Sequence, residues 1–452
     1  MAQMLSVFDG KRTMTECLSV LENRFELSRN DLQEILDRYI ENREWINSED
    51  ESKCFLALEN MLIQKGDYER VEYYKMEDFP MSGKADFSFR RNHGPVVAIF
   101  ELTMRCYTDC VYCYADRRNH VETNLSTQEI LDVIRQMKQI GVKDVSINGG
   151  EVLLHPDIKE ILQEMVRCGY YPLISTKYPV EYEMLEFLHK IGITQIQISI
   201  DSINPDTLSS VLKVDKDYFE KIRHTMKLLD EMRFHWQTNT ILTKYNSHLE
   251  KEVKPLFSFL TSFKHIRNIR SSEAGYSLYK TPEHYRAIKA RAEDLHSIAL
   301  YIDTLKDTFP SINFKSPNPM SESLFCGVNK KVDFQERAIC TGNEQALIVL
   351  PDGKVTICEE LYWHPQFLIG DLRENTLAEI WNGKKALDLF YIQQNVISES
   401  SPCKLCHDFK ECRHHKGVCW KMILQAYGME QWDQADPRCP DALPLKNEIY
   451  YK

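Results

Sequence analysis

Short β-rich runs alternate with amphipathic helical patterns from Pro95 to about Tyr276, and this alternation constrains the fold more than any other feature. Repeated strand–helix units need crossover connections, so the pattern predicts an α/β fold with a partial (β/α)6 TIM-like barrel. Functional residues on such a scaffold gather at the carboxyl ends of the strands. The expected strands are Val96–Leu102, Asp144–Ile147, Pro172–Ser175, Ile196–Ile200, Trp236–Leu242 and Ile266–Ile269, with helices between them, for example Thr127–Ile140 and Asp217–Met232.

The N-terminal residues follow a different pattern, which predicts a small helical module with some strand. Thr13 is placed to cap a first helix, and Ser28 opens a second. Trp45 and Ile46 follow as a candidate wing strand. The expected divisions are this module over residues 1–80, a polar and aperiodic linker over 81–94, the barrel over 95–310 and a cysteine-rich domain over 311–452.

Length, charge and hydropathy exclude several classes of protein. A chain of 452 residues suits two to three domains of about 150 residues each. The net charge of −11, without a long basic run, argues against nucleic acid as a partner. No window approaches about 18 uninterrupted apolar residues, which argues against a membrane span. The first residues lack a signal-peptide pattern, so we expect a cytoplasmic protein.

The chain contains fourteen cysteines, which in a reducing compartment indicate metal ligation or catalysis rather than disulfides. Cys17, Cys54 and Cys168 are scattered, as expected of small core-filling residues. The others form a tight group and a C-terminal group. The tight group is Cys106, Cys110 and Cys113, and the C-terminal group is Cys326, Cys340, Cys358, Cys403, Cys406, Cys412, Cys419 and Cys439.

The tight group forms the pattern C-x3-C-x2-C directly after the first expected strand of the barrel. Three thiolates so close together can hold three corners of a [4Fe–4S] cubane, and no suitable fourth ligand lies nearby in the chain. One iron is then open to a substrate or cofactor. The alternative is a zinc knuckle, although structural zinc sites prefer paired CxxC units and a closed fourth position.

This pattern at the end of the first strand resembles that of the radical S-adenosylmethionine (SAM) enzymes. The run Asn148–Glu151 ends the second strand and matches the GGE motif of that family. The resemblance implies that Gly149 and Gly150 let the backbone approach the methionine amino group, and that Glu151 pairs with the ammonium. It also implies that Tyr112 packs against the adenine.

Further SAM contacts are implied at the ends of later strands, by Ser175, Thr176, Ser199, Asp201 and Leu242. For Ser175, Ser199 and Asp201 the alternative is helix capping. The family often carries an arginine shortly after the fourth strand, where this chain has Lys213. Lysine can meet a carboxylate but lacks the planar fork of arginine.

The resemblance also implies a mechanism. SAM chelates the open iron through its amino and carboxylate groups, and an electron from a flavodoxin- or ferredoxin-type reductant cleaves the sulfonium. The products are methionine and a 5′-deoxyadenosyl radical, which removes an unactivated hydrogen from the substrate. Such a radical needs a barrel interior closed to water and to stray reductants.

The C-terminal cysteines resemble the SPASM extension of radical SAM enzymes that modify peptides. The chain departs from that pattern before Cys419, with six residues where the family usually has three. Pro351-Asp352-Gly353 predicts a hairpin turn that brings Cys340 and Cys358 together. Two auxiliary [4Fe–4S] clusters are implied, with two four-thiolate zinc sites as the alternative. The implied ligands are Cys326, Cys340, Cys358 and Cys419 for one cluster, and Cys403, Cys406, Cys412 and Cys439 for the other.

Glu359 directly follows Cys358. In sulfatase-maturing members of the family an acid at this place acts as a general base, because deprotonation makes a carbon radical easier to oxidise. The resemblance therefore makes Glu359 a candidate catalytic residue. A solvated glutamate beside Glu360 is the alternative.

The run from Phe8 to Phe25 resembles the winged-helix element that recognises precursors in enzymes modifying ribosomally made peptides. A leader peptide adds to that element as an extra strand, and a structural winged helix bracing the barrel is the alternative. The whole resemblance implies a maturase that installs a cross-link, first of all a cysteine thioether, in a ribosomal precursor peptide. The alternatives are a carbon–carbon or carbon–oxygen cross-link, sulfatase-type formylglycine maturation, and a zinc-bound peptide-binding scaffold.

Overall fold

The computed structural model describes residues 7, 13–32, 53–56, 61–64, 91–116, 124–317 and 334–447. The chain forms two compact units, Met1–Arg90 and Arg91–Lys452, so the end of the expected linker belongs to the second unit. Arg91 is anchored there, since its guanidinium stacks 3.7 Å from the centre of the Trp381 ring and its Nε donates to the Asn343 carbonyl at 2.7 Å.

The first unit contains helix α2 (Met14–Phe25) and an antiparallel hairpin of β1 (Lys53–Leu56) and β2 (Met61–Gln64), which was not predicted. The helix begins where the sequence predicts, because Thr13 and Glu16 form a reciprocal capping box. Residues 29–32 are helical, but the rest of the second predicted helix and the candidate strand at 45–46 lie outside the described residues. The described part of this unit does not confirm a winged helix.

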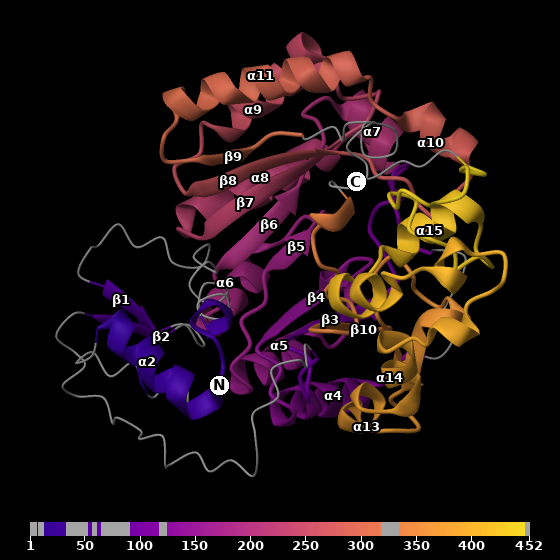
Figure 1. Ribbon diagram of the computed structural model, residues 1–452. Coiled ribbons are helices and arrows are strands. Elements are labelled where there is room, and N and C mark those ends of the chain that lie inside the picture. The colour runs from indigo at the N-terminus through magenta and orange to yellow at the C-terminus, as the bar shows by residue number, and fades with distance from the viewer. Residues whose placement is uncertain are drawn as a thin grey trace. The chain divides into compact units, whose positions relative to one another are not determined.

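The second unit contains the predicted partial barrel (Figure 1). All six predicted strands are present, and a short seventh, β9, extends the second sheet beyond the prediction. Strand β4 pairs with β3, whereas β5 begins a separate sheet, so the barrel is open between β4 and β5 among the described residues. The parallel strands are β3 (Val97–Thr103), β4 (Asp144–Gly149), β5 (Ile174–Thr176), β6 (Gln195–Ser199), β7 (His235–Leu242), β8 (Ile266–Glu273) and β9 (Asn313–Lys315).

Helices connect these strands, as expected for crossover units. Helix α4 begins at the predicted residue and ends one residue before the predicted end. Ser126 and Glu129 form a capping box at its first turn. The helices of this part are α4 (Thr127–Gln139), α5 (Ile158–Arg167), α6 (Tyr182–Lys190), α7 (Pro205–Leu212), α8 (Tyr218–Glu231), α9 (Lys254–Leu260), α10 (Pro282–Ile288) and α11 (Ala292–Thr308). Shorter 3-10 or π segments cover Val152–Leu154 and Leu249–Val253.

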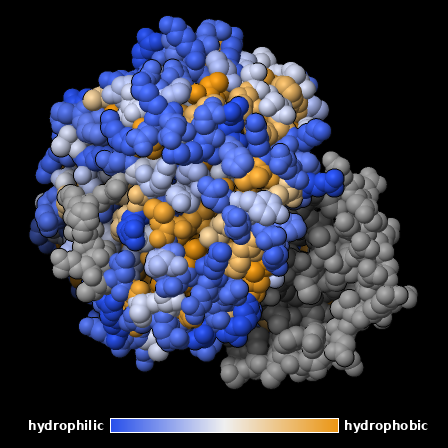
Figure 2. All heavy atoms as spheres, turned by 180° about the vertical axis from the view of Figure 1, so that it is seen from behind, coloured by the Kyte–Doolittle hydropathy of each residue, from blue (hydrophilic) through white to orange (hydrophobic). Residues whose placement is uncertain are grey.

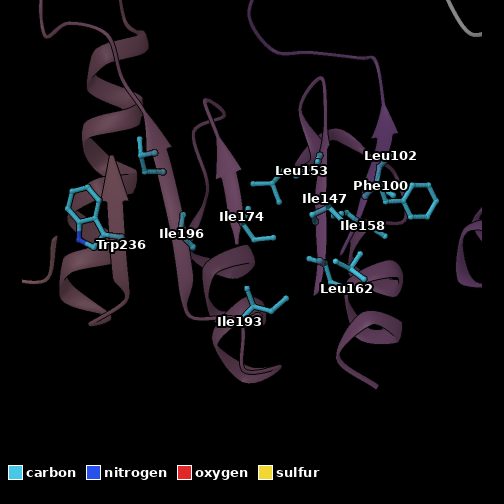
Figure 3. Close-up of a cluster of buried hydrophobic side chains, with 14 of the residues drawn as sticks. Phe100, Leu102, Ile147, Leu153, Ile158, Leu162, Ile174, Ile193, Ile196 and Trp236 are labelled. Carbon is cyan, nitrogen blue, oxygen red and sulfur yellow. The ribbon is translucent and has the colours of Figure 1, made fainter. Parts of the chain in front are cut away.

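Alternation along β3 separates two environments. Phe100 and Leu102 lie in the main core, where Figure 3 shows them beside Ile147 of β4 and Leu162 of α5. The intervening residue Ile99 packs instead against a second cluster that contains residues of the C-terminal region. One strand therefore joins the helical layer on one side to the C-terminal region on the other.

The C-terminal region adds strands to the barrel sheet. Strand β10 (Ala346–Val349) pairs in parallel with β3. Strand β11 (Lys354–Thr356) pairs antiparallel with β10, and β12 (Leu368–Asp371) pairs antiparallel with β11. The predicted hairpin turn lies between β10 and β11, with Gly353 at a φ of 88°. The remaining helices are α13 (Leu377–Trp381), α14 (Lys384–Phe390) and α15 (Trp420–Tyr427), and short 3-10 or π segments cover Pro365–Phe367, Gln394–Val396, Pro402–Leu405 and Glu411–Lys416.

Hydrophilic residues cover most of the face drawn in colour in Figure 2, with apolar groups near its middle. Among the described residues, no helix is both long enough and apolar enough to cross a bilayer.

Candidate active site

A cavity of about 340 Å³ lies at the carboxyl ends of the barrel strands, where the fold predicts function. Its wall includes residues from every barrel strand end from β3 to β8, together with two residues of the C-terminal region. The residues predicted from the sequence that line it are Cys106, Cys110, Tyr112, Cys113, Gly149, Gly150, Glu151, Ser175, Thr176 and Ser199.

The three cysteines of the first group lie together in the loop after β3, and all are free thiols. The Thr108 hydroxyl lies between two of them, 3.6 Å from Cys106 Sγ and 3.2 Å from Cys110 Sγ. The loop is fixed to the end of α7, since Asp109 and Val111 each donate a backbone N–H at 2.9 Å to α7 carbonyls. These carbonyls at the end of the helix would otherwise lack partners.

The two glycines of the GGE motif join β4 to this cysteine loop. Gly149 has a φ of 125°, and Gly150 N donates to the Thr103 carbonyl at 2.6 Å. A Cβ on Gly150 would lie 2.0 Å from the Arg105 carbonyl oxygen. Only glycine fits this close approach of backbone to backbone, a reason that the sequence analysis did not give.

Glu151 is buried at the cavity wall, and burial raises the pKa of its carboxyl group. The carboxylate accepts hydrogen bonds from the backbone N–H groups of Leu153 at 3.3 Å and Lys177 at 3.1 Å. These donors fix its orientation toward the cavity, where a ligand ammonium can reach it.

Tyr112 and Asp201 form a pair. The Tyr112 hydroxyl donates to the Asp201 carboxylate, which also accepts the backbone N–H of Ile241 at 2.8 Å. Asp201 does not itself line the cavity, so it positions the tyrosine ring. The helix-capping alternative is wrong, because the N-cap residues of α6 and α7 are Glu181 and Asn204 instead.

Two predicted SAM contacts lie elsewhere. Lys213 is exposed at the end of α7, in a left-handed backbone conformation with a φ of 58°, and Leu242 is fully buried in the core. Neither lines the cavity.

The structure places a different lysine in the cavity, directly after the predicted Ser175-Thr176 pair. The Nζ of Lys177 lies 5.6 Å from the centre of the Tyr112 ring. Burial opposes its charge, but Cys110, Asp201, Cys106 and Glu151 together outweigh that effect and raise its pKa. The sequence analysis missed Lys177, although a basic residue beside a polar strand end was the available signal. Other lining residues that it missed are Gln197, Asn239, Ile241, Glu273, Tyr276, Glu360 and Lys421.

Glu360, rather than the predicted Glu359, lines the cavity. Its carboxylate forms an ion pair with Lys421 of α15, and the two side chains keep only 16% and 10% of their surface exposed. Glu359 lies near Glu101 of β3, whose pKa rises to about 8 through burial and the charge of Glu359. A one-residue difference along the loop thus decides which glutamate faces a ligand.

The structure brings the C-terminal cysteines together in two sets. In the first set (Cys340, Cys358 and Cys419), burial raises the pKa of Cys358, and the other two thiols add to it. Cys340 keeps exposed surface, yet the packing around its thiol raises its pKa as well. In the second set (Cys403, Cys406, Cys412 and Cys439), burial raises the pKa of Cys439 to about 12, with contributions from Cys412 and Cys403. Cys326 lies outside the described residues.

These residues fit iron–sulfur clusters. The three cysteines of the first group open onto one cavity beside the lining carboxylate of Glu151 and the cation of Lys177. In the second set, buried Arg413 donates to Cys403 Sγ while its Nε and Nη1 have no partner among the described residues, as expected beside missing acceptors. No three His, Cys, Asp or Glu side chains in the described ranges converge closely enough for a single metal ion.

Comparison with known proteins agrees with this site. Residues 100–259 match the radical SAM superfamily, and residues 340–412 match an iron–sulfur cluster-binding domain, SPASM. A probable GTP 3′,8-cyclase of Methanothermobacter marburgensis is 28% identical over 28% of this chain and 42% of its own length. The chain thus spans less than half of that relative. A PqqA peptide cyclase of Methylorubrum extorquens is 23% identical over 71% of this chain and 80% of its own length.

A solved structure shares the fold. Streptococcus suis SuiB bound to SAM superimposes with a TM-score of 0.56 at 18% identity, over 77% of this chain and 78% of that one. The domain matches identify SAM and [4Fe–4S] clusters as the cofactors, with iron–sulfur rather than zinc in the C-terminal region. The chain belongs to the radical SAM superfamily of enzymes and carries a SPASM domain.

Proposed function

We propose that this enzyme is a peptide maturase that installs a cross-link, first of all a cysteine thioether, in a ribosomally synthesised precursor peptide. The observation that carries the proposal is the shared cavity. Its barrel wall bears the cysteine loop and Glu151, and its C-terminal wall bears the Glu360–Lys421 ion pair. A substrate side chain entering between these walls meets both the SAM site and the SPASM domain.

The residues of the barrel wall divide the work of binding SAM. Cys106, Cys110 and Cys113 would hold the cluster, which with SAM supplies a 5′-deoxyadenosyl radical for hydrogen abstraction. Glu151 offers a fixed anion for the ligand ammonium, and Lys177 offers a cation for the carboxylate. Asp201 holds the Tyr112 ring beside the cavity for the adenine.

The part of the cavity formed by the end of β8 and the SPASM loop suits a polar substrate side chain. Glu273 ends β8, and burial raises the pKa of its carboxyl group. The Tyr279 hydroxyl donates at 3.1 Å to the Glu360 carbonyl and so ties this loop of the SPASM domain to the segment after β8. The wall is therefore fixed before a substrate arrives, which lowers the cost of orienting it.

The named relatives support a peptide substrate. SuiB has been solved with its precursor peptide SuiA, and the PqqA relative is named a peptide cyclase. The β1–β2 hairpin of the first unit supplies backbone edges to which a leader peptide can add as a further strand. We place the reaction in the cytoplasm with a flavodoxin- or ferredoxin-type reductant, because free thiols and low-potential clusters need a reducing setting.

Two experiments test the proposal. The first is anaerobic reconstitution of the purified enzyme with iron and sulfide, followed by an assay with SAM. The second is co-expression of the enzyme with a short cysteine-containing peptide encoded nearby. We expect deoxyadenosine on addition of dithionite, and a loss of two hydrogens per cross-link in the peptide mass. Fragmentation then distinguishes a thioether from a carbon–carbon or carbon–oxygen bond. Replacement of sulfur by oxygen would instead indicate formylglycine, and a colourless zinc protein that releases no deoxyadenosine would contradict the proposal.

A further inference from the structure

Two buried arginines distinguish the second cysteine set from the first. Arg337 Nη2 donates to Cys412 Sγ at 3.1 Å, and Arg413 Nη2 donates to Cys403 Sγ at 3.3 Å. The two residues are only 9% and 5% exposed. Arginine stays protonated in proteins, so both positive charges are buried directly beside thiol sulfurs.

These two guanidinium groups lack the carboxylate partners that buried cations usually have. Backbone carbonyls accept from both side chains, such as Gly417 O from Arg337 at 2.8 Å and Gln434 O from Arg413 at 2.7 Å. Neither guanidinium forms an ion pair with a carboxylate of the described residues. The buried Asp436 also acts on Cys412, but it is already paired with Arg438. Asp408 and Asp441 approach the second set as well, but both are exposed, where solvent and salt screen them.

The cations near the first set are paired with carboxylates instead. Asp436 accepts the backbone N–H of Cys419 at 3.0 Å and is itself paired with Arg438 at 2.8 Å. The Glu360 carboxylate, two residues after Cys358, is paired with Lys421. Among the described residues, the two cations near this set, Lys421 and Arg438, thus each pair with a carboxylate, whereas the second set faces two cations without one.

We propose that Arg337 and Arg413 are redox-tuning residues, which raise the reduction potential of the cluster at the second set above that at the first. The inference rests on the assignment of two auxiliary clusters made above. Reduction adds one electron and neither forms nor breaks a bond. A positive charge and N–H donors at the sulfurs stabilise the added negative charge, so they favour the reduced state. An electron released at the cavity would then come to rest on the second set.

The test is a potentiometric titration followed by electron paramagnetic resonance. It uses the reconstituted full chain with Cys106, Cys110 and Cys113 changed to Ala, so that only auxiliary clusters contribute. We expect two distinct potentials. Arg337→Gln and Arg413→Gln should each lower the reduction equilibrium constant of the higher-potential cluster about tenfold, which is about 59 mV for one electron. The lower potential should stay unchanged.

Conservative variants separate tuning from support. Arg337→Lys and Arg413→Lys keep the charge and should recover part of the shift, which a purely structural role would not produce. Arg373→Gln removes an arginine paired with Glu129 and should move neither potential. Unchanged potentials in both glutamine variants at full iron content would overturn the proposal.

If the variants lose iron, their potentials cannot be compared, so a further measurement uses the unsubstituted chain. With ¹⁵N-arginine incorporated, pulsed resonance on the higher-potential cluster should show coupling to arginine nitrogen, and its absence would overturn the proposal. None of these measurements needs SAM turnover or a peptide. A chain that shows the shifts but leaves every precursor unmodified would therefore contradict the proposed function alone.

Discussion

The cysteine loop of the barrel and the cysteine sets of the C-terminal region are built in opposite ways. Cys106, Cys110 and Cys113 lie within one loop, which backbone hydrogen bonds join to β4 and α7. The first C-terminal set instead collects Cys340, Cys358 and Cys419 from segments far apart in the chain.

The difference shows where the order of each site comes from. A parallel sheet with buried strands holds the loop in place, so its geometry is fixed by the barrel. Few regular elements hold the thiols described between α14 and residue 447, so we expect cluster binding there to contribute directly to folding. Loss of a cysteine from the loop should therefore stop SAM cleavage. Loss of a cysteine from a C-terminal set should stop modification of the peptide while SAM cleavage continues.

The largest expected effect separates these two outcomes. Cys110→Ala should abolish deoxyadenosine formation, because the cluster loses one of three ligands. Cys406→Ala, its matched control, should leave SAM cleavage within about threefold and remove about four irons per chain. Iron analysis and chromatography of deoxyadenosine check both variants, and equal loss of SAM cleavage would break the comparison.

A glycine substitution tests how firmly β4 holds the loop. Gly150→Ala should cost about 3 kcal/mol of unfolding free energy, because the added methyl meets the Arg105 carbonyl at 2.0 Å. Gly141→Ala places alanine at a positive φ, but its methyl meets nothing within 4 Å, so this change should cost about 1 kcal/mol. Denaturant unfolding measures both costs, and similar values would contradict the close approach.

Two lysines test whether the barrel cavity alone selects the ligand. Lys177→Met should weaken SAM binding about 10- to 100-fold, or about 1.4–2.8 kcal/mol, because the cavity loses the cation beside Tyr112 and the cysteine loop. Lys213→Met changes an exposed residue outside the cavity and should leave affinity unchanged. Isothermal titration with SAM measures the affinity of each variant. Weaker binding by the Lys213 variant, with unchanged binding by the Lys177 variant, would instead support the lysine predicted from the sequence.

The smallest effect concerns the junction of the two regions. The raised pKa of Glu101, about 8, means that the folded chain holds a proton there that the unfolded chain releases near pH 4.5. Stability should therefore fall as the pH rises from about 4.5 to 8. Glu101→Gln should recover about 1–2 kcal/mol at pH 8.5 and much less at pH 5. Thermal unfolding at the two pH values decides, and an equal gain at both would contradict the assignment.

Much of the barrel was predictable because its elements are local. The strand and helix patterns gave all six predicted strands and the start of α4, and the cysteine loop and GGE motif follow strand ends directly. The hairpin β1–β2 and the edge strand β9 were missed, since runs of three or four residues carry little periodicity.

Side-chain direction was less predictable. Glu359 and Glu360 are adjacent and chemically identical, and only the turn after Cys358 decides which lines the cavity. Lys177 was missed for the same reason, while Lys213 matched a family position but lies at the end of α7. A motif gives the residue type at a position, whereas packing decides whether its side chain reaches the site.

The sequence by itself determined the barrel and the loop with three thiols, because each depends on neighbouring residues or on short spacings. The cofactors followed from the resemblance of these motifs to the radical SAM family. Only the tertiary structure decided that β10 extends the barrel sheet beside β3 and that Lys421 lines the same cavity as the thiols. It also placed buried arginines against one cysteine set. These contacts join residues distant in the chain, and their energies depend on burial and distance, which spacing along the chain does not encode.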